Sequence, residues 1–209
     1  MNEQQATVFV VDDDASVRRA LERLLIGVGY QVQTYPSATA YLAREPHDGV
    51  GCVLLDIHMP DMSGTALQLQ LAEMQRDIPI VFLTAHGDIR TSVGAMKHGA
   101  VDFLTKPVDE QAVFSAIEEA LMRHRRLLNE RLSRSTIEKR VNALTRREYE
   151  VMRYVIGGAR NKQIAGHLGI SEKTVKAHRG QAMQKMAVKS VAELVRLCEA
   201  ARIAPEQIR

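Results

Sequence analysis

The chain has 209 residues, enough for one large or two modest domains, and its 45% hydrophobic and 25% charged residues are ordinary for a globular protein. It has no run of about 18 apolar residues and no basic N-terminal segment followed by an apolar core, so we expect no membrane span, signal peptide or membrane partner. Cys52 and Cys198 lack metal-ligand spacing, and we expect a cytoplasmic protein without a disulfide.

The net charge of +3 hides an uneven distribution. Residues 1–122 carry 8 Lys/Arg and 17 Asp/Glu. Residues 123–141 carry 7 basic and 2 acidic residues, and residues 142–209 carry 13 basic and 6 acidic residues. An acidic first half and a basic second half indicate that the second half binds nucleic acid.

Apolar strand-like runs alternate with helical patterns throughout the first half. Short runs of Val, Leu, Ile and Phe are typical of strands buried on both faces, as in a parallel sheet. We expect strands at residues 7–11, 31–35, 50–55, 79–83 and 101–104, and helices at 17–28, 37–44, 66–75, 89–99 and from 109 onward. This alternation predicts an α/β fold, a doubly wound parallel sheet of five strands.

Polar side chains follow four of these predicted strands at the point where each strand ends. Because the carboxyl ends of parallel strands line one edge of the sheet, where ligands bind, we expect these side chains to meet there. The set comprises Asp12, Asp13, Asp14, Asp56, Thr84 and Lys106.

Crowded carboxylates repel one another unless a cation joins them, and oxygen ligands with room for water favour Mg²⁺ over softer metals. Such a metal would keep Asp56 ionised, and its carboxylate could then attack phosphorus and become an acyl phosphate. Lys106 offers a charge, and Thr84 a hydroxyl, to the phosphoryl oxygens. The residue types alone leave an alternative open, a set of strand-end caps and a surface lysine.

Residues 7–122 resemble the receiver domain of bacterial two-component response regulators. The motifs that carry the resemblance are Val11-Asp12-Asp13, Leu55-Asp56 with Met59-Pro60 and Gly64, Thr84-Ala85, and Lys106-Pro107. The resemblance implies an Mg²⁺ site made of Asp12, Asp13, Asp56 and the backbone carbonyl of His58. It implies that Asp56 is the phospho-acceptor, that Thr84 and Phe103 are switch residues, that Lys106 assists catalysis, and that the Lys106–Pro107 peptide is cis. Asp14 lies outside the acidic pair, and we expect it to cap the first helix.

The segment from Glu118 to Leu132 continues the last receiver helix into a basic linker. We expect Ser133 to Ser135 to break this helix, with a capping box at Ser135 and Glu138 opening a short second segment. Leucines at irregular spacing favour a plain connector over a dimer seam, which remains the alternative.

The second half predicts four helices with recognisable N-terminal caps. A capping box at Thr145 and Glu148 opens the first helix, which ends at Gly157-Gly158. We expect Asn161 to cap the second helix, Ser171 the third, from Glu172 to about Met186, and Ser190 the fourth.

The middle pair of these helices follows the pattern of a helix-turn-helix. Ala165 is small where two helices would cross, Gly169 suits a turn that needs a positive φ, and Val175 returns an apolar side chain to the core. With the basic charge, this pattern predicts binding to double-stranded DNA.

The third helix is the predicted recognition helix. Its exposed face would present Lys173, Lys176, Ala177 and Gly180 to base edges. Side chains better placed for phosphates are Asn161, Lys162, Thr174, Arg179 and Lys185. His178 is expected to pack partly beneath the helix.

Residues 142–203 resemble the LuxR/FixJ/NarL-type four-helix DNA-binding domain. The residues that carry the resemblance are Leu144-Thr145-x-x-Glu148, Asn161-Lys162-x-Ile164-Ala165 and Thr174-Val175-Lys176-x-His178. One departure is Gly180, where several relatives have a lysine that contacts DNA.

Together the two resemblances indicate a FixJ-like response regulator. They imply a receiver domain at residues 1–122, a helical linker at 123–141 and a LuxR-type domain at 142–209. We expect a transcription regulator that a sensor histidine kinase phosphorylates at Asp56, that forms a homodimer on phosphorylation, binds promoter DNA and contacts RNA polymerase. It would not be an enzyme, apart from slow loss of its own phosphoryl group.

Two other functions are weighed against this one. A haloacid-dehalogenase-type phosphatase also combines Asp-x-Asp with a threonine and a lysine, but needs a second acidic pair where residues 85–88 supply one acid, Asp88. A DNA-binding protein with a purely structural receiver is the other alternative, and the complete set of acidic residues disfavours it.

Overall fold

A computed structural model describes residues 6–85, 94 and 96–208. The chain divides into two compact units, Met1–Leu128 and Asn129–Arg209. Most of the helix expected at residues 89–99, and three of the residues at 85–88 weighed for a phosphatase, lie outside the described residues.

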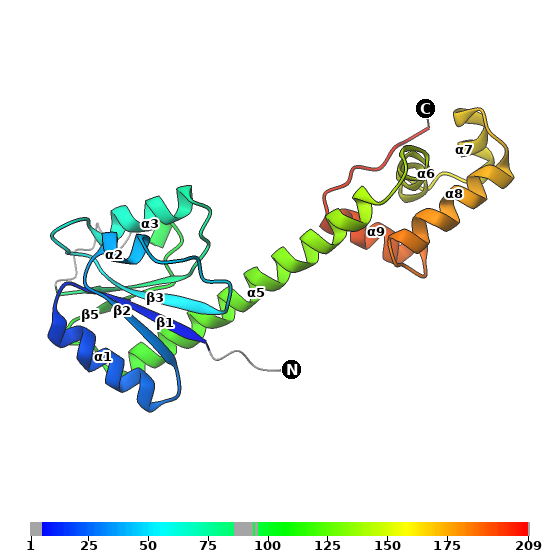
Figure 1. Ribbon diagram of the computed structural model, residues 1–209. Coiled ribbons are helices and arrows are strands. Elements are labelled where there is room, and N and C mark those ends of the chain that lie inside the picture. The colour runs from blue at the N-terminus through cyan, green and yellow to red at the C-terminus, as the bar shows by residue number, and fades with distance from the viewer. Residues whose placement is uncertain (1–5, 86–93, 95, 209) are drawn as a thin grey trace. The chain divides into compact units, whose positions relative to one another are not determined.

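The first unit is built on a five-stranded parallel sheet with the order β2-β1-β3-β4-β5 (Figure 1). The predicted doubly wound α/β fold is confirmed. Strands β1, β3 and β4 are buried along their whole length, as their uninterrupted apolar runs require. The strands are β1 (Thr7–Val11), β2 (Gln31–Tyr35), β3 (Gly51–Asp56), β4 (Ile80–Thr84) and β5 (Asp102–Thr105).

Helices cover both faces of this sheet (Figure 1). On one face, α1 (Ala15–Gly27) and the first part of α5 (Glu110–Asn142) contribute Leu21, Leu25 and Ile117 to an apolar core. On the other face, α2 (Ala38–Leu42) and α3 (Gly64–Glu73) contribute Tyr41 and Leu67 to a second core. This double cover leaves the carboxyl edge of the sheet as the place where polar side chains gather.

Helix α5 runs without interruption from Glu110 to Asn142, so the predicted break at Ser133 to Ser135 was wrong. The segment contains no Gly or Pro, and serine alone disfavours a helix only weakly. Local contacts also support the helix: the Thr136 hydroxyl donates to the Leu132 carbonyl, and Arg134 pairs with Glu138 one turn later. Ser135 therefore begins no new segment.

The second unit contains the end of α5 and four further helices, α6 (Arg146–Ile156), α7 (Asn161–Leu168), α8 (Glu172–Lys185) and α9 (Val191–Ala200). The capping box of Thr145 and Glu148 is present, and Ser171 and Ser190 cap α8 and α9 as predicted. Asn161 does not cap α7. The N-cap is Arg160, whose backbone N–H donates to Gln163 Oε1, and Asn161 is the first helical residue.

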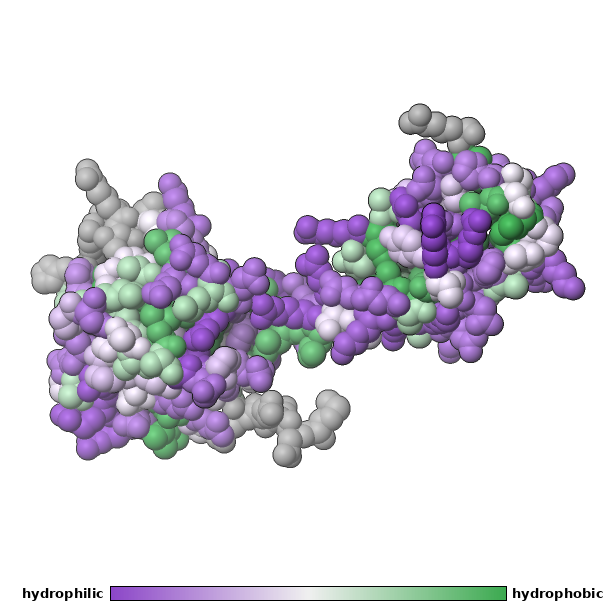
Figure 2. Space-filling model, turned by 45° about the horizontal axis from the view of Figure 1, so that its top comes forward, coloured by the Kyte–Doolittle hydropathy of each residue, from purple (hydrophilic) through white to green (hydrophobic). Residues whose placement is uncertain are grey.

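None of the described helices is long and apolar enough to cross a membrane. Figure 2 shows surfaces that are mostly hydrophilic, with small hydrophobic patches between polar side chains. Cys52 and Cys198 are buried free thiols.

Candidate functional site

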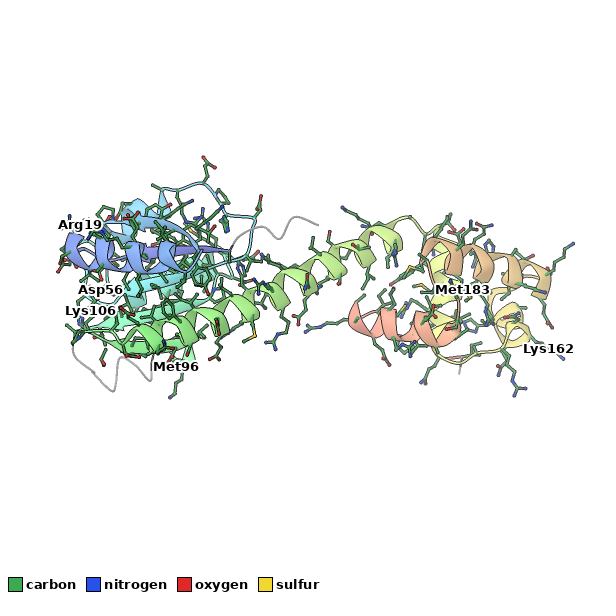
Figure 3. The ribbon with its side chains drawn as sticks, turned by 90° about the horizontal axis from the view of Figure 1, so that it is seen from below. Arg19, Asp56, Met96, Lys106, Lys162 and Met183 are labelled. Atoms are coloured by element: carbon green, nitrogen blue, oxygen red, sulfur yellow. The ribbon has the colours of Figure 1, made fainter. Side chains whose placement is uncertain are left out.

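The carboxyl edge of the sheet brings together residues that are far apart in the sequence. Asp12 follows β1, Asp56 ends β3, and Lys106 follows β5. Lys106 Nζ lies 2.6 Å from Asp12 Oδ2 and 3.0 Å from Asp56 Oδ2. Figure 3 shows Asp56 and Lys106 side by side at one end of the sheet. Parallel topology thus produces the predicted meeting.

Three carboxylates converge in this pocket. Asp12, Asp13 and Asp56 each place an oxygen within 4.8 Å of the other two. Asp12 and Asp56 are buried whereas Asp13 is exposed, so the cluster opens towards water on one side. A set of hard oxygen donors with a wet side is what Mg²⁺ prefers in proteins, and these residues could hold it. Asp14 does not join the cluster; its carboxylate accepts from the Ser16 N–H and caps α1, as expected.

Burial and ion pairing set the protonation of the pocket. Burial raises the pKa of Asp12 above its ordinary value, while hydrogen bonds from Lys106 and from the Asp14 N–H act in the opposite direction. For Lys106, burial alone would lower the pKa, but the hydrogen bonds to Asp12 and Asp56 outweigh it and the pKa is raised. Lys106 is therefore a cation at neutral pH.

The remaining expected pocket residues lie along the same edge. Thr84 ends β4 and is fully buried, and its carbonyl accepts from the Lys106 N–H at 2.6 Å. Phe103 is half-buried in β5, with its ring centroid 5.8 Å from that of Phe82. The His58 N–H donates to Asp56 Oδ1 at 3.3 Å, while the His58 side chain is exposed. The Lys106–Pro107 peptide is cis.

The second unit contains the predicted helix-turn-helix. Ala165 and Val175 are buried where α7 and α8 cross, and Gly169 ends α7 with φ +65°, a left-handed conformation that favours glycine. Ser171 then accepts from the Thr174 N–H and starts α8. Small residues and a glycine turn therefore fix the angle at which α8 leaves the core.

One face of α8 is open to solvent. Lys173, Lys176, Ala177 and Gly180 are all exposed. Their spacing of three and four residues places them on a single helix face. Lys162 is also exposed, near the start of α7 (Figure 3). This surface has the charge and shape that a major groove accepts.

The other predicted DNA contacts are half-buried and already have partners within the unit. Arg179 donates to Asn161 Oδ1 at 3.2 Å, and the hydroxyls of Thr174 and Ser171 lie 2.8 Å apart. Lys185 Nζ lies 2.7 Å from Glu148 Oε2, so its ammonium is engaged inside the domain. The hydrogen bond from Lys185, with that from the Thr145 N–H, lowers the pKa of Glu148.

Two structural roles were missed by sequence reasoning. Glu148 was identified as a capping residue but not as a buried partner of Lys185, which lies 37 positions away. Arg140, assigned only to a basic linker, donates to the carbonyl of Met186 at the end of α8, at 3.1 Å. Neither contact has a local signal, because both depend on how helices pack.

The first unit is a parallel sheet with an acidic pocket bridged by a lysine. The second contains a helix-turn-helix with a basic exposed face. This combination defines a DNA-binding response regulator. The family of the response regulator receiver domain matches residues 8–118, and the luxR family of bacterial regulatory proteins matches residues 142–198. The chain belongs to the two-component response regulators of the FixJ/NarL family.

Relatives span nearly the whole chain. The response regulator protein TmoT of Ectopseudomonas mendocina is 42% identical over 95% of this chain and 90% of that protein. The transcriptional regulatory protein FixJ of Rhizobium meliloti is 39% identical over 95% of this chain and 98% of that protein. Among solved structures, the response regulator StyR is 49% identical, with a TM-score of 0.85 over 93% of this chain and 98% of that chain.

Proposed function

We propose that the chain is a transcription regulator switched by transfer of a phosphoryl group from a sensor histidine kinase to Asp56. The observation that carries the proposal is the pocket itself, in which Lys106 Nζ lies 3.0 Å from the Asp56 carboxylate beside two further acidic residues. A carboxylate oxygen of Asp56 attacks phosphorus, the bond from phosphorus to the kinase imidazole breaks, and the imidazole leaves with its electron pair.

The residues of the pocket have distinct roles in this transfer. Lys106 is a point charge for the phosphoryl oxygens and moves from its present ion pairs to one of them. Thr84 supplies a hydroxyl to a second oxygen. Asp12, Asp13, Asp56 and the His58 carbonyl would hold Mg²⁺, which supplies charge neutralisation between the carboxylates and the incoming phosphoryl group.

The output of the switch follows from the neighbours of the pocket. Thr84 and the half-buried Phe103 stand on adjacent strands, so a hydroxyl drawn towards a phosphoryl oxygen leaves space that the aromatic ring can enter. We propose that this rearrangement favours a homodimer, a shift between two existing states of one fold. No substrate other than its own acyl phosphate is turned over.

The dimer would bind promoter DNA through α8 and act together with RNA polymerase. Lys173 and Lys176 lie on the exposed face of α8 and are proposed to reach base edges, and Lys162 a phosphate. Asn161, Thr174 and Arg179 act from half-buried positions at the edge of this surface. Lys185 would need to leave Glu148 to touch a phosphate, so its present role is to hold α8 against α6.

The test is the solution mass of wild type and Asp56→Asn, each with and without beryllofluoride and Mg²⁺. We expect a monomer that becomes a dimer only when the wild type receives both reagents. Dimerisation of Asp56→Asn under the same conditions would exclude Asp56 as the acceptor. If the wild type binds beryllofluoride but remains a monomer, dimerisation is not the consequence of phosphorylation.

A further inference from the structure

The C-terminal end of the recognition helix is held by a side chain from the linker helix. Carbonyls in the last turn of a helix have no partner within the helix itself. In α8 the turn that follows satisfies two of them: the N–H groups of Ala187 and Val188 donate to Gln184 and Met183. The Met186 carbonyl instead accepts from Arg140 Nη1 at 3.1 Å.

Arg140 reaches this carbonyl from a part of α5 that is packed against the core of the second unit. It lies near the end of α5, half-buried, between Ile137 and Val141, both of which pack into the core of the second unit. Met186 is fully buried in the same core. A guanidinium at a helix C-terminus is also favoured by the helix dipole. The contact is therefore anchored at both ends.

A second cation holds the same turn of α8 from another direction. Lys185, next to Met186, pairs with the buried Glu148 at the start of α6. The C-terminal turn of α8 is thus tied to two different helices. Its exposed residues Lys173 and Lys176 lie towards the other end. A rotation at the fixed end changes where the exposed face points.

Helix α5 also belongs to the core of the receiver unit. Val113 and Ile117 of α5 are fully buried in the cluster that covers one face of the sheet. The same continuous helix ends with Ile137 and Arg140 in the second unit. Arg140 therefore stands on the same helix as residues that pack in the receiver core.

We infer that Arg140 is a positioning residue for DNA recognition: it couples the state of α5 to the orientation of α8 without touching DNA. The part of this inference that concerns phosphorylation rests on the proposed function, whereas the positioning of α8 does not.

The test compares Arg140→Gln, Arg140→Lys and the control Lys139→Gln, which removes the same charge from an exposed neighbour. The probe is a DNA duplex obtained by selection on the wild-type protein, and affinity is measured over a range of salt concentrations. We expect Arg140→Gln to weaken binding about tenfold with the salt slope unchanged, because no phosphate contact is lost. Arg140→Lys should restore part of the affinity, and Lys139→Gln should stay within about twofold of wild type.

Three outcomes would overturn the inference. Wild-type affinity in Arg140→Gln would show that the contact does not position α8. A salt slope reduced by about one would make Arg140 a direct phosphate contact. An equal loss in Lys139→Gln would indicate a general effect of charge.

The coupling to phosphorylation is tested with the same variants in the presence and absence of beryllofluoride and Mg²⁺. If Arg140 transmits the switch, the gain in DNA affinity on adding the reagents should shrink towards one in Arg140→Gln and persist in Lys139→Gln. A full gain in Arg140→Gln would refute the coupling. The absence of any gain in wild type would instead count against the proposed function, and the salt-slope result would still decide the positioning role.

Discussion

The two units of the chain hold their important charges in opposite ways. In the receiver unit, Asp12, Asp56 and Lys106 are largely shielded from water and bonded to one another. In the helical unit, Lys162, Lys173 and Lys176 stand exposed. Buried charges interact strongly because water does not screen them, and they suit chemistry within the protein. Exposed charges contribute little to folding and remain free for a partner.

The largest effect is expected when the buried pair is broken. Replacing Lys106 with Met leaves Asp12, which is fully buried, without its cation, and should destabilise the receiver unit by about 3 kcal/mol at pH 7. Amide hydrogen exchange in β1 and β3 measures this. The exposed Lys97→Met is the control and should change stability by less than about 0.5 kcal/mol.

The pH dependence of Lys106→Met sharpens this prediction. The pKa of Asp12 is already raised by burial, and loss of the Lys106 hydrogen bond raises it further. A carboxyl whose pKa is higher in the folded than in the unfolded state destabilises the protein least below the unfolded pKa of about 3.9. The protein loses stability as pH rises through the folded-state pKa of that carboxyl. The defect should therefore shrink on acidification. A defect independent of pH would attribute it to packing of the lysine stem.

The second effect concerns the backbone beneath the pocket. A Cβ added to Gly64 would clash with the backbone carbonyl oxygen of Asp56. Gly64→Ala must push α3 away from β3, which should cost about 2 kcal/mol and displace Asp56 from Lys106. Amide shifts of Asp56 and hydrogen exchange in β3 would report both. Unchanged shifts at Asp56 would mean that the loop, not the pocket, absorbs the strain.

Much of this pocket was predictable because the topology of the sheet determines where its residues lie. Asp12, Asp56, Thr84 and Lys106 each follow an apolar run, and parallel strands necessarily end at one edge. The sequence did not reveal that Lys106 lies closer to Asp12 than to Asp56. That preference depends on side-chain packing, which strand positions do not specify.

The helical unit shows which features local sequence signals predict and which they do not. Caps at Thr145, Ser171 and Ser190 were predictable because each needs only the next three residues. Asn161 was misplaced as a cap: α7 begins at Asn161 itself, and its amide oxygen accepts from Arg179, which lies 18 positions away. The continuity of α5 was not predicted because the serines were treated as helix breakers. Serine disfavours a helix only weakly.

A smaller effect is expected from the ion pair between Lys185 and the buried Glu148 in the helical unit. Glu148→Gln removes the charge that binds Lys185 and should destabilise this unit by about 1 kcal/mol at pH 7, since Lys185 is partly exposed and screened. Hydrogen exchange in α6 measures it. Glu150→Gln, which breaks only the pairs with Arg146 and Arg147 at the surface, should have less effect and serves as the control.

The direction of the pH dependence is opposite to that at Asp12. Hydrogen bonds from Lys185 and the Thr145 N–H lower the pKa of Glu148 in the folded state. Its stabilisation is therefore present above the unfolded pKa of about 4.3 and is lost as pH falls through the folded value. The difference between wild type and Glu148→Gln should close in acid. A constant difference down to pH 2 would contradict the ion pair.

The smallest effect has the opposite sign. Gly180 lies inside α8 on its exposed face, and a Cβ there would meet nothing within 4 Å. Gly180→Ala should stabilise the helical unit by about 0.7 kcal/mol, because alanine loses less backbone entropy in a helix. The same substitution thus costs stability at Gly64 and adds it at Gly180. Hydrogen exchange in α8 measures the gain, and its absence would mean that α8 is already rigid at this position. Weaker DNA binding by the more stable Gly180→Ala would show that the open space above Gly180 is kept for DNA.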